Sequence, residues 1–362
     1  MEYKSSTMEA MVNTSFWFGK NVLITGHSGF KGSWLTLWLT SLGVNVFGYS
    51  LSPESDMSLF NNLKFDHNLT SSFNDIRNIE CLKNFVQQSN PDIIFHMAAQ
   101  PLVSESYCNP LYTYETNVFG TINLLEAVRN INKKCTIIVI TTDKVYDNCE
   151  IEYAYKETDK LGGLDPYSSS KACCELIINS WRNSFYQKNT NIKIATARAG
   201  NVIGGGDWAK NRIIPDLIRS IQDNKTLIIR NPYSTRPWQH VLEPLSGYLM
   251  LAHKLHSSDE IIFQSSFNFG PNEKSNKTVV ELIDECFIHW NGNYLIKDNE
   301  NKFYESNLLQ VSIEKSKTIL NWTPKWNFQE CIKNTIEWYK KFNKLEDITK
   351  VTLEQIRIFN QI

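Results

Sequence analysis

Short apolar runs alternate with helical patterns through the first two hundred residues of the chain. Five of these runs are bounded by turn residues and are predicted to be strands buried on both faces: 21–25, 45–49, 92–96, 136–141 and 192–198. Between them, apolar residues recur at helical spacing, as they do over 116–130. This alternation predicts an α/β fold of the Rossmann type, a doubly wound parallel sheet with helices on both faces.

The pattern changes after Gly200. A glycine run at 204–206 is followed by shorter helical and strand-like patterns that prolines interrupt. We therefore expect a dinucleotide-binding Rossmann domain over 16–200 and a smaller mixed α/β C-terminal substrate lobe over 201–345, partly interleaved with it. Residues 1–15 are polar and lack periodicity, so they are expected to be disordered, whereas the tail, 346–362, is expected to add a helix.

Composition narrows the classes of protein to consider. The 362 residues, 42% of them hydrophobic, suffice for one large domain or for two smaller ones that share a cleft. A formal net charge of -1 gives no electrostatic reason to expect nucleic acid or a membrane surface as a partner, and no apolar run approaches the roughly 18 residues of a membrane span. Eight cysteines without a C-x-x-C pair indicate reduced thiols and a cytoplasmic protein. The seven histidines show no ligand spacing, so no metal site is expected.

Three glycines, Gly26, Gly29 and Gly32, follow the first predicted strand at three-residue spacing. Such a turn lets backbone approach a pyrophosphate and directs a helix N-terminus at its charge. Three glycines can also simply mark a tight turn, but here the strand before them and the helical pattern after them are both present. The motif therefore predicts a dinucleotide site.

The end of the second predicted strand bears on the choice of dinucleotide. No acidic residue follows it directly to bind the adenosine ribose, since the nearest are Glu54 and Asp56. The same segment contains no arginine that could receive a 2′-phosphate. The cofactor that this pattern favours is NAD, although the segment does not decide between NAD and NADP.

Tyr167 and Lys171 are four positions apart, so on a helix they share one face. A lysine there can hold the nicotinamide ribose and lower the pKa of the phenol. Asp165 and Pro166 are typical of an N-cap and a first helical position, which places Tyr167 in the first turn. A Tyr-x-x-x-Lys pair usually means only surface packing. The glycine turn upstream and the segment 142–144 make that alternative unfavourable.

Together with the segments 96–100 and 198–208, these motifs resemble the extended short-chain dehydrogenase/reductases, and the resemblance runs from about Gly19 to Trp326. The subgroup that the chain resembles most is that of the CDP-glucose 4,6-dehydratases. They have a lysine at the position of Lys144, where dehydratases acting on dTDP-glucose or GDP-mannose have an acidic residue. The resemblance implies oxidation of the hexose at C4 by NAD, loss of water across C5 and C6, and hydride return to C6.

The resemblance also implies a role for each residue of the reacting centre. Tyr167 takes the proton of the 4-hydroxyl, Thr142 hydrogen-bonds the same oxygen, and Lys171 supports the phenolate. We interpret Asp143 as the acid that protonates the leaving 6-hydroxyl. Lys144 occupies the position of the C5 base, which a lysine can fill only when it is neutral. An Asp-Lys pair is more often a solvated turn, but ligands bind at the carboxyl ends of strands in open α/β sheets.

The resemblance assigns further contacts to the cofactor and the substrate. The expected cofactor-binding residues are Gly26, Ser28, Gly29, Phe30, Lys31, Gly32, Asp75, Ile76, Ala98, Ala99, Gln100, Asn117, Thr141, Tyr167, Lys171 and Arg198. The expected substrate-binding residues, for a nucleotide diphosphate and its base, are Asn201, Arg212, Arg236, Trp238 and His240. Asp75 is equally compatible with a helix N-cap, and any one arginine with a solvated surface charge. Members of this superfamily commonly form homodimers through two long helices, here around 106–130 and 167–187.

Two other functions remain open at this stage. A sugar-nucleotide epimerase on the same scaffold would return hydride to C4 and would not need Asp143 and Lys144. Epimerases of this superfamily typically have Ser-Ser or Ser-Thr where this chain has Thr142 and Asp143. A non-enzymatic nucleotide-sensing module would have no need of Tyr167 and Lys171 at the start of a helix.

Overall fold

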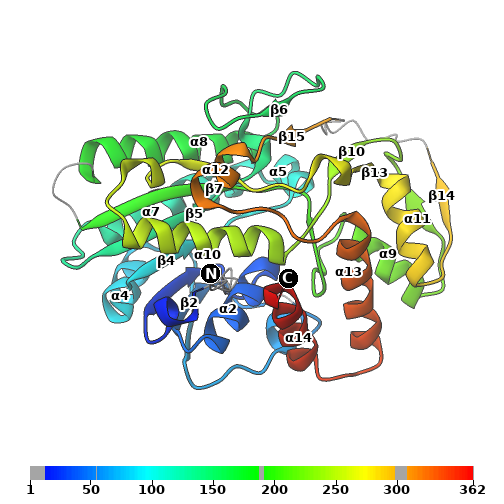
Figure 1. The fold of residues 1–362 in the computed structure, drawn as a ribbon, viewed down its shortest axis with the longest axis horizontal. Coiled ribbons are helices and arrows are strands. Elements are labelled where there is room, and N and C mark those ends of the chain that lie inside the picture. Colours follow the sequence, from blue (N-terminus) through cyan, green and yellow to red (C-terminus); the bar gives the residue numbers. More distant parts are fainter. Residues whose placement is uncertain (1–12, 54, 187–190, 298–307, 362) are drawn as a thin grey trace, which may run out of the picture.

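The computed structural model describes residues 13–53, 55–186, 191–297 and 308–361. Its centre is a seven-stranded parallel sheet in the order β12-β7-β5-β4-β1-β2-β3, which confirms the predicted fold class (Figure 1). The strands are β1 (Asn21–Thr25), β2 (Asn45–Ser50), β3 (Leu69–Phe73), β4 (Ile93–His96), β5 (Cys135–Ile140), β7 (Ile192–Arg198) and β12 (Ser266–Asn268). The strand order reverses between β1 and β4, and ligands bind at such a switch point in open α/β sheets.

All five strands predicted from apolar runs are present, but two other strands of the central sheet were missed. β3 carries Thr70, Ser71 and Ser72 and lies at the sheet edge, so it has no apolar run to detect. β12 has only three residues and comes from the later part of the chain. It pairs with β7, so this later part contributes a strand to the central sheet. The proposed boundary at residue 201 stays a prediction.

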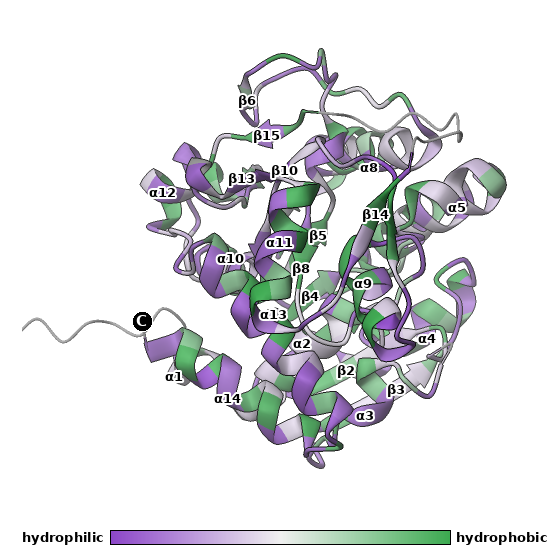
Figure 2. Cartoon of the chain, turned by 90° about the vertical axis from the view of Figure 1, so that its right-hand side faces the viewer, coloured by the Kyte–Doolittle hydropathy of each residue, from purple (hydrophilic) through white to green (hydrophobic). Residues whose placement is uncertain are grey.

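Helices cover both faces of the sheet. One face packs against α2 (Phe30–Ser41) and α10 (Leu242–Ser257), and the other against α4 (Ile79–Ser89), α7 (Gly120–Val128) and α8 (Pro166–Trp181). Successive residues of β1 show the alternation, since Val22 and Ile24 belong to one apolar cluster and Leu23 to the other. Figure 2 shows the central strands as predominantly hydrophobic.

The helix predicted over 116–130 is in two parts. A π-helical segment, η1 (Glu115–Phe119), precedes α7. Short helices come before it, α5 (Val103–Cys108) and α6 (Pro110–Tyr114). Single π-turns of this kind are frequent at functional sites, and this one contains Asn117.

The chain after residue 201 adds helices and pairs of short strands. Besides α10, its helices include α9 (Ile213–Gln222), α11 (Val279–His289), α12 (Glu314–Leu320) and α13 (Phe328–Asn343). Its strand pairs are β8 (Val202–Ile203) with β11 (Gln239–His240), β9 (Leu227–Ile229) with β14 (Tyr294–Ile296), and β10 (Thr235–Pro237) with β13 (Asn276–Thr278), while β15 (Gln310–Val311) pairs with β6 (Ala154–Tyr155) from the earlier part of the chain. Within the described ranges, no helix combines the length and apolar character needed to cross a membrane.

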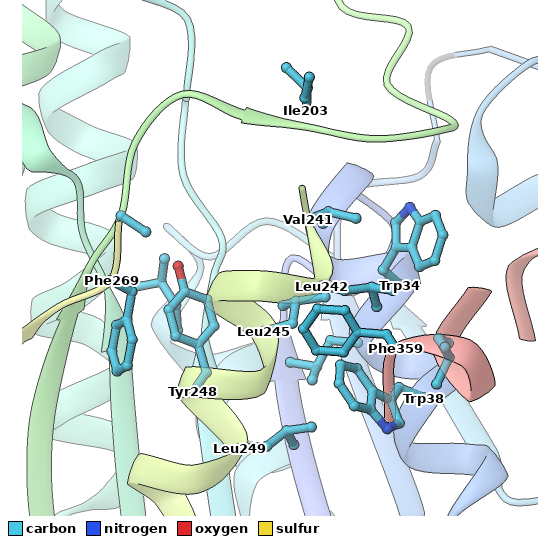
Figure 3. Close-up of a cluster of buried hydrophobic side chains, with 14 of the residues drawn as sticks. Trp34, Trp38, Ile203, Val241, Leu242, Leu245, Tyr248, Leu249, Phe269 and Phe359 are labelled. Atoms are coloured by element: carbon cyan, nitrogen blue, oxygen red, sulfur yellow. The ribbon is translucent and has the colours of Figure 1, made fainter. Parts of the chain in front are cut away.

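Both ends of the described chain are ordered on the α2 side of the molecule. The tail forms α14 (Ile348–Gln361), as predicted, and Phe359 packs edge-on against Trp38 of α2 and Trp326 (Figure 3). Residues 1–12 and Glu54 lie outside the described residues. At the N-terminus, Asn13 caps the short helix α1 (Thr14–Trp17), so helical structure begins within the segment expected to be disordered.

Candidate active site

The three glycines of the first turn have the geometry that a dinucleotide site requires. Gly26 has a φ of +77°, and a Cβ there would lie 2.7 Å from the backbone nitrogen of Ala98. A Cβ on Gly32 would collide with the Gly26 carbonyl oxygen, which shows how closely α2 packs on the turn. A Cβ on Gly29 meets only that same oxygen, at 3.4 Å. Gly29 also caps α2 without a side-chain hydrogen bond, so the N–H groups of the first turn are available for phosphate oxygens.

The end of β2 presents hydroxyl groups where an acidic residue is usual. The Ser28 and Ser50 Oγ atoms are 2.7 Å apart, and Nδ1 of buried His27 lies 3.0 Å from Ser50 Oγ. His27 Nε2 lies 3.0 Å from Ser71 Oγ on β3. Burial lowers the pKa of His27 to about 4, so this cluster is uncharged at neutral pH.

The loop after β4 contacts both the glycine turn and η1, the π-helical segment that carries Asn117. Thr25 Oγ1 lies 2.7 Å from His96 Nδ1 and accepts a hydrogen bond from the Ala98 backbone N–H. The Asn117 side chain accepts from the Gln100 backbone N–H at 2.8 Å and donates to Ser170 Oγ on α8 at 2.9 Å. Asn117 thus joins two of the segments expected to contact the cofactor.

The catalytic wall, as we call Thr142, Asp143, Tyr167 and Lys171, lies where β5 ends and α8 begins. Asp165 caps α8, accepting a hydrogen bond from the Ser168 backbone N–H at 2.9 Å, and Pro166 is the first helical residue, as predicted. Thr142 caps the short 3₁₀ helix η2 (Asp143–Val145) that follows β5. The spacing prediction for this region is therefore confirmed in its local structure.

Hydrogen bonds connect the members of the wall. Thr142 is hydrogen-bonded to the Tyr167 hydroxyl, and its Oγ1 donates to Asp143 Oδ1 at 3.0 Å. Asn201 Nδ2 donates to Asp143 Oδ2 at 3.2 Å. A Cβ at Gly200 would collide with both carboxylate oxygens, so this glycine leaves the space that the Asp143 side chain fills.

The pKa of the Tyr167 phenol is shifted by burial in the direction opposite to the one predicted. Burial raises the pKa of Tyr167 to about 12, and the hydrogen bond from Thr142 only partly offsets this rise. Lys171 Nζ donates to the Ile140 carbonyl at 3.2 Å, and burial lowers the pKa of Lys171 itself. The prediction that Lys171 lowers the phenol pKa is thus wrong for the protein alone, because the desolvation of a buried phenolate dominates.

Two further cations approach the wall. Lys31, in the first turn of α2, has its pKa lowered to about 8 by burial and by the charges of Lys171 and Arg212. Arg212 immediately precedes α9, forms an ion pair with Asp207 at 2.9 Å, and acts electrostatically on Tyr167. Of the predicted substrate-binding residues, Arg212 and Asn201 are therefore the two that the structure brings to the wall.

Arg198 and Thr141 both donate hydrogen bonds to Glu175, a residue that was not predicted to have a role. Glu175 receives bonds from Arg198 Nε at 3.0 Å and from Thr141 Oγ1 at 2.6 Å. The remaining Arg198 nitrogens donate to protein oxygens, among them the Tyr146 hydroxyl at 2.8 Å. Burial would raise the pKa of Glu175, but Arg198 lowers it overall. The Arg198 side chain thus supports the sheet, and its contact with a cofactor stays a prediction.

A signal for Glu175 was present in the sequence. It lies four residues after Lys171, which lies four after Tyr167, so all three share one face of α8. Tyr248 on α10 was also missed. Its buried hydroxyl has no hydrogen-bond partner among the described residues, and its ring lies 6.0 Å from Lys31 Nζ (Figure 3).

Asp75 and Ile76, which are expected to bind the cofactor, lie in a segment that an ion pair holds. The Asp75 carboxylate pairs with Arg77 at 2.7 Å, and Arg77 also pairs with Glu115. The alternative role of Asp75 as an N-cap is wrong, because Asn78 caps α4. Ile76 is buried beside Gly120 at the start of α7.

The other predicted substrate residues lie on β10, on β11 and between these two strands. Arg236 is buried on β10 and donates to the Thr235 carbonyl at 3.0 Å, and Trp238 Nε1 donates to the Lys277 carbonyl at 2.9 Å. His240 is fully buried and packs edge-on against the rings of Trp34 and Trp326.

Lys144 is half-buried and lines a small cavity together with Asp165 and Ser168 at the start of α8. Among the residues that the structure describes, no group of three or more side chains could hold a metal ion.

The sequence model of the GDP-mannose 4,6-dehydratase family matches residues 23–335. The chain belongs to this family. The family is one of the extended short-chain dehydrogenase/reductases, and the Rossmann-type sheet of this chain agrees with that membership.

Relatives of this family member include both dehydratases and epimerases. It is 45% identical to the CDP-glucose 4,6-dehydratase of Salmonella typhimurium over 344 residues, covering 93% of this chain and 95% of that protein. It is 26% identical to the UDP-glucose 4-epimerase of Mycoplasma genitalium over 75% of this chain and 82% of that protein. Among solved structures, the dTDP-glucose 4,6-dehydratase of Bacillus anthracis in complex with NAD is similar with a TM-score of 0.76, 24% identity, and coverage of 91% of this chain and 100% of that chain.

Proposed function

We propose that this protein is an NAD-dependent CDP-glucose 4,6-dehydratase that acts in the cytoplasm and forms CDP-4-dehydro-6-deoxyglucose. The observation that carries the proposal is the hydrogen bond from Thr142 to Asp143 beside Tyr167. It places a carboxyl group next to the centre where C4 would be oxidised. The 45% identity to a CDP-glucose 4,6-dehydratase supports the choice of substrate.

The glycine turn would hold NAD by its pyrophosphate, with Lys171 at the nicotinamide ribose. Bound there, NAD would supply the acceptor for the C4 hydride and the donor that returns it to C6. Tyr167, as phenolate, accepts the proton of the 4-hydroxyl, while Thr142 hydrogen-bonds the same oxygen. Burial raises the pKa of Tyr167 to about 12, which opposes its ionisation, and the positive charge of bound NAD would favour the phenolate.

The ketone at C4 then acidifies the C5 hydrogen. Lys144 in its neutral form removes this proton, and Asp143 in its acid form protonates the 6-hydroxyl so that water leaves. Asn201 and Gly200 fix the Asp143 carboxyl in its position. The diphosphate would lie against Arg212 and Asn201, with Arg236 and Trp238 towards the base.

The test is to incubate the purified protein separately with CDP-glucose, dTDP-glucose, UDP-glucose and GDP-mannose, with and without added NAD, and to measure the product masses. Loss of one water from CDP-glucose alone is the expected result. An isomerised sugar of unchanged mass would instead identify an epimerase and would contradict the roles given to Asp143 and Lys144.

A homodimer is part of the proposal. Helices α6, η1 and α8 contact one another and carry exposed apolar side chains, among them Leu111, Phe119 and Leu176. Exposed apolar patches of this kind typically mark protein interfaces. We expect sedimentation to give twice the chain mass, and Leu176→Lys to shift the protein towards monomer.

A further inference from the structure

The hydrogen bonds of the catalytic wall form one continuous chain. The Tyr167 hydroxyl bonds to Thr142, and Thr142 Oγ1 donates onward to Asp143 Oδ1 at 3.0 Å. Asn201 donates a hydrogen bond to the other carboxylate oxygen, Oδ2, so the series of hydrogen bonds from Tyr167 ends at Asp143 Oδ1. Because a hydroxyl has one proton to donate and lone pairs that accept, Thr142 can donate to Asp143 Oδ1 while Tyr167 is protonated and donates to Thr142, as the transfer of a proton requires.

The proposed reaction needs one proton to travel between these two groups. The hydride taken from C4 ends on C6, and the proton taken from C5 by Lys144 returns to C5. The departing water consists of the 6-hydroxyl and one additional proton. The 4-hydroxyl loses one proton, to Tyr167. In the net reaction, Tyr167 therefore gains one proton, and Asp143 must supply one proton.

Exchange of these protons with solvent is hindered by burial. Thr142 and Asp143 are 4% and 1% exposed, and Tyr167 is also buried. Without an internal path, Tyr167 would have to release its proton to water, and Asp143 would have to take one up, in every turnover. The chain through Thr142 makes both exchanges unnecessary.

We propose that the Thr142 hydroxyl relays the proton of the substrate 4-hydroxyl from Tyr167 to Asp143, so that this proton leaves in the product water. The relay rests on the proposed dehydratase function. In it the Tyr167 O–H bond breaks as a Thr142 O–H bond forms, and the original Thr142 O–H bond breaks as the Asp143 Oδ1–H bond forms. Tyr167 returns to phenolate, and Asp143 becomes the acid that the next step consumes. After water leaves, both groups have recovered their starting charges.

The experiment compares the wild-type protein, Thr142→Val and Thr142→Ser in single turnovers with CDP-glucose and bound NAD. Absorbance of the reduced nicotinamide reports hydride transfer, and mass analysis of quenched samples reports water loss. Valine keeps the shape of threonine without the hydroxyl, and serine keeps the hydroxyl. The relay predicts that water loss in the wild-type and serine proteins does not slow as the pH rises from about 6 to about 9, because the proton for the leaving water is supplied internally.

In Thr142→Val, the relay predicts that water loss slows by at least about tenfold relative to hydride transfer, with accumulation of reduced nicotinamide and the 4-ketohexose. Relative to the wild-type rate at the same pH, its rate should also fall about tenfold per pH unit at high pH, because Asp143 must then be protonated from solvent. If Thr142→Val slows only hydride transfer and keeps the wild-type pH profile for water loss, Thr142 acts solely on the 4-hydroxyl and the relay is wrong.

Two further outcomes keep the relay distinct from the proposed function. A wild-type rate of water loss that itself falls with rising pH would contradict the relay even if Thr142→Val does not fold. A wild-type protein that forms no dehydrated sugar from any of the four nucleotide sugars would contradict the proposed function, and with it the relay.

Discussion

The catalytic wall and the segment 236–240 differ in how their side chains are held. In the wall, Thr142 and Asp143 follow a buried strand directly, and Tyr167 and Lys171 lie one helical turn apart. In the segment 236–240, Arg236 and His240 lie on short strands whose partners come from other parts of the chain, and Trp238 lies between the two strands. Local geometry fixes the first group, and tertiary packing fixes the second.

This difference determines which functional assignments can be transferred from a family to this chain by a sequence motif alone. Three members of the wall, Thr142, Asp143 and Tyr167, bond to one another, so the motif and the site coincide there. Trp238 and His240 bond or pack mainly within the core, so their position in a family motif does not by itself make them ligand contacts.

Tyr167→Phe should have the largest effect. Without the hydroxyl, the 4-hydroxyl has no base and Thr142 loses its partner, so C4 oxidation should slow by about 10²–10⁴-fold and water loss with it. Single-turnover absorbance of reduced nicotinamide measures the rate. Tyr153→Phe, at an exposed tyrosine outside the wall, is the matched control. Near wild-type oxidation by Tyr167→Phe would remove Tyr167 from the mechanism.

Asp143→Asn should separate the two halves of the reaction. The amide keeps the shape of the side chain but cannot donate an acidic proton, so water loss should slow by about 10²-fold or more while hydride transfer to NAD changes far less. Reduced nicotinamide should then accumulate in a single turnover, and its formation in the same trace serves as the internal control. Equal slowing of both steps would show that Asp143 is not the acid.

Arg212→Met tests whether the wall extends into the substrate lobe. Arg212 acts electrostatically on Tyr167, so we expect it to bind a phosphate, and its loss should raise KM about 10- to 100-fold with a smaller change in kcat. Arg219→Met is a matched control, because Arg219 lies on the same helix and also pairs with an aspartate, Asp216. An equal KM for both variants would place the diphosphate elsewhere.

The same distinction between local geometry and tertiary packing explains which features could be predicted from the sequence. The glycine turn, the capped start of α8 and five buried strands were predicted because each depends on residues close together in the chain. The Glu175–Arg198 ion pair and the contact of Asn201 with Asp143 join residues 23 and 58 positions apart, so spacing alone did not reveal them. The pKa of Tyr167 was predicted in the wrong direction because desolvation depends on the packing around the phenol.

His240→Phe gives the smallest expected effect and tests the core assignment directly. Burial lowers the pKa of His240 to about 3, from an ordinary value of 6.5, so the folded protein keeps the ring neutral. The unfolded chain takes up a proton below pH 6.5, and the free energy of unfolding therefore falls by up to about 1.4 kcal/mol per pH unit between 6.5 and 3. Between pH 7 and about pH 5, urea unfolding of the wild-type protein should lose up to about 2 kcal/mol more than His240→Phe does. His67→Gln, at an exposed histidine, should keep the wild-type pH dependence. An unchanged slope in His240→Phe would mean that the ring reaches solvent and is free to contact substrate, which would bring it back into the binding site.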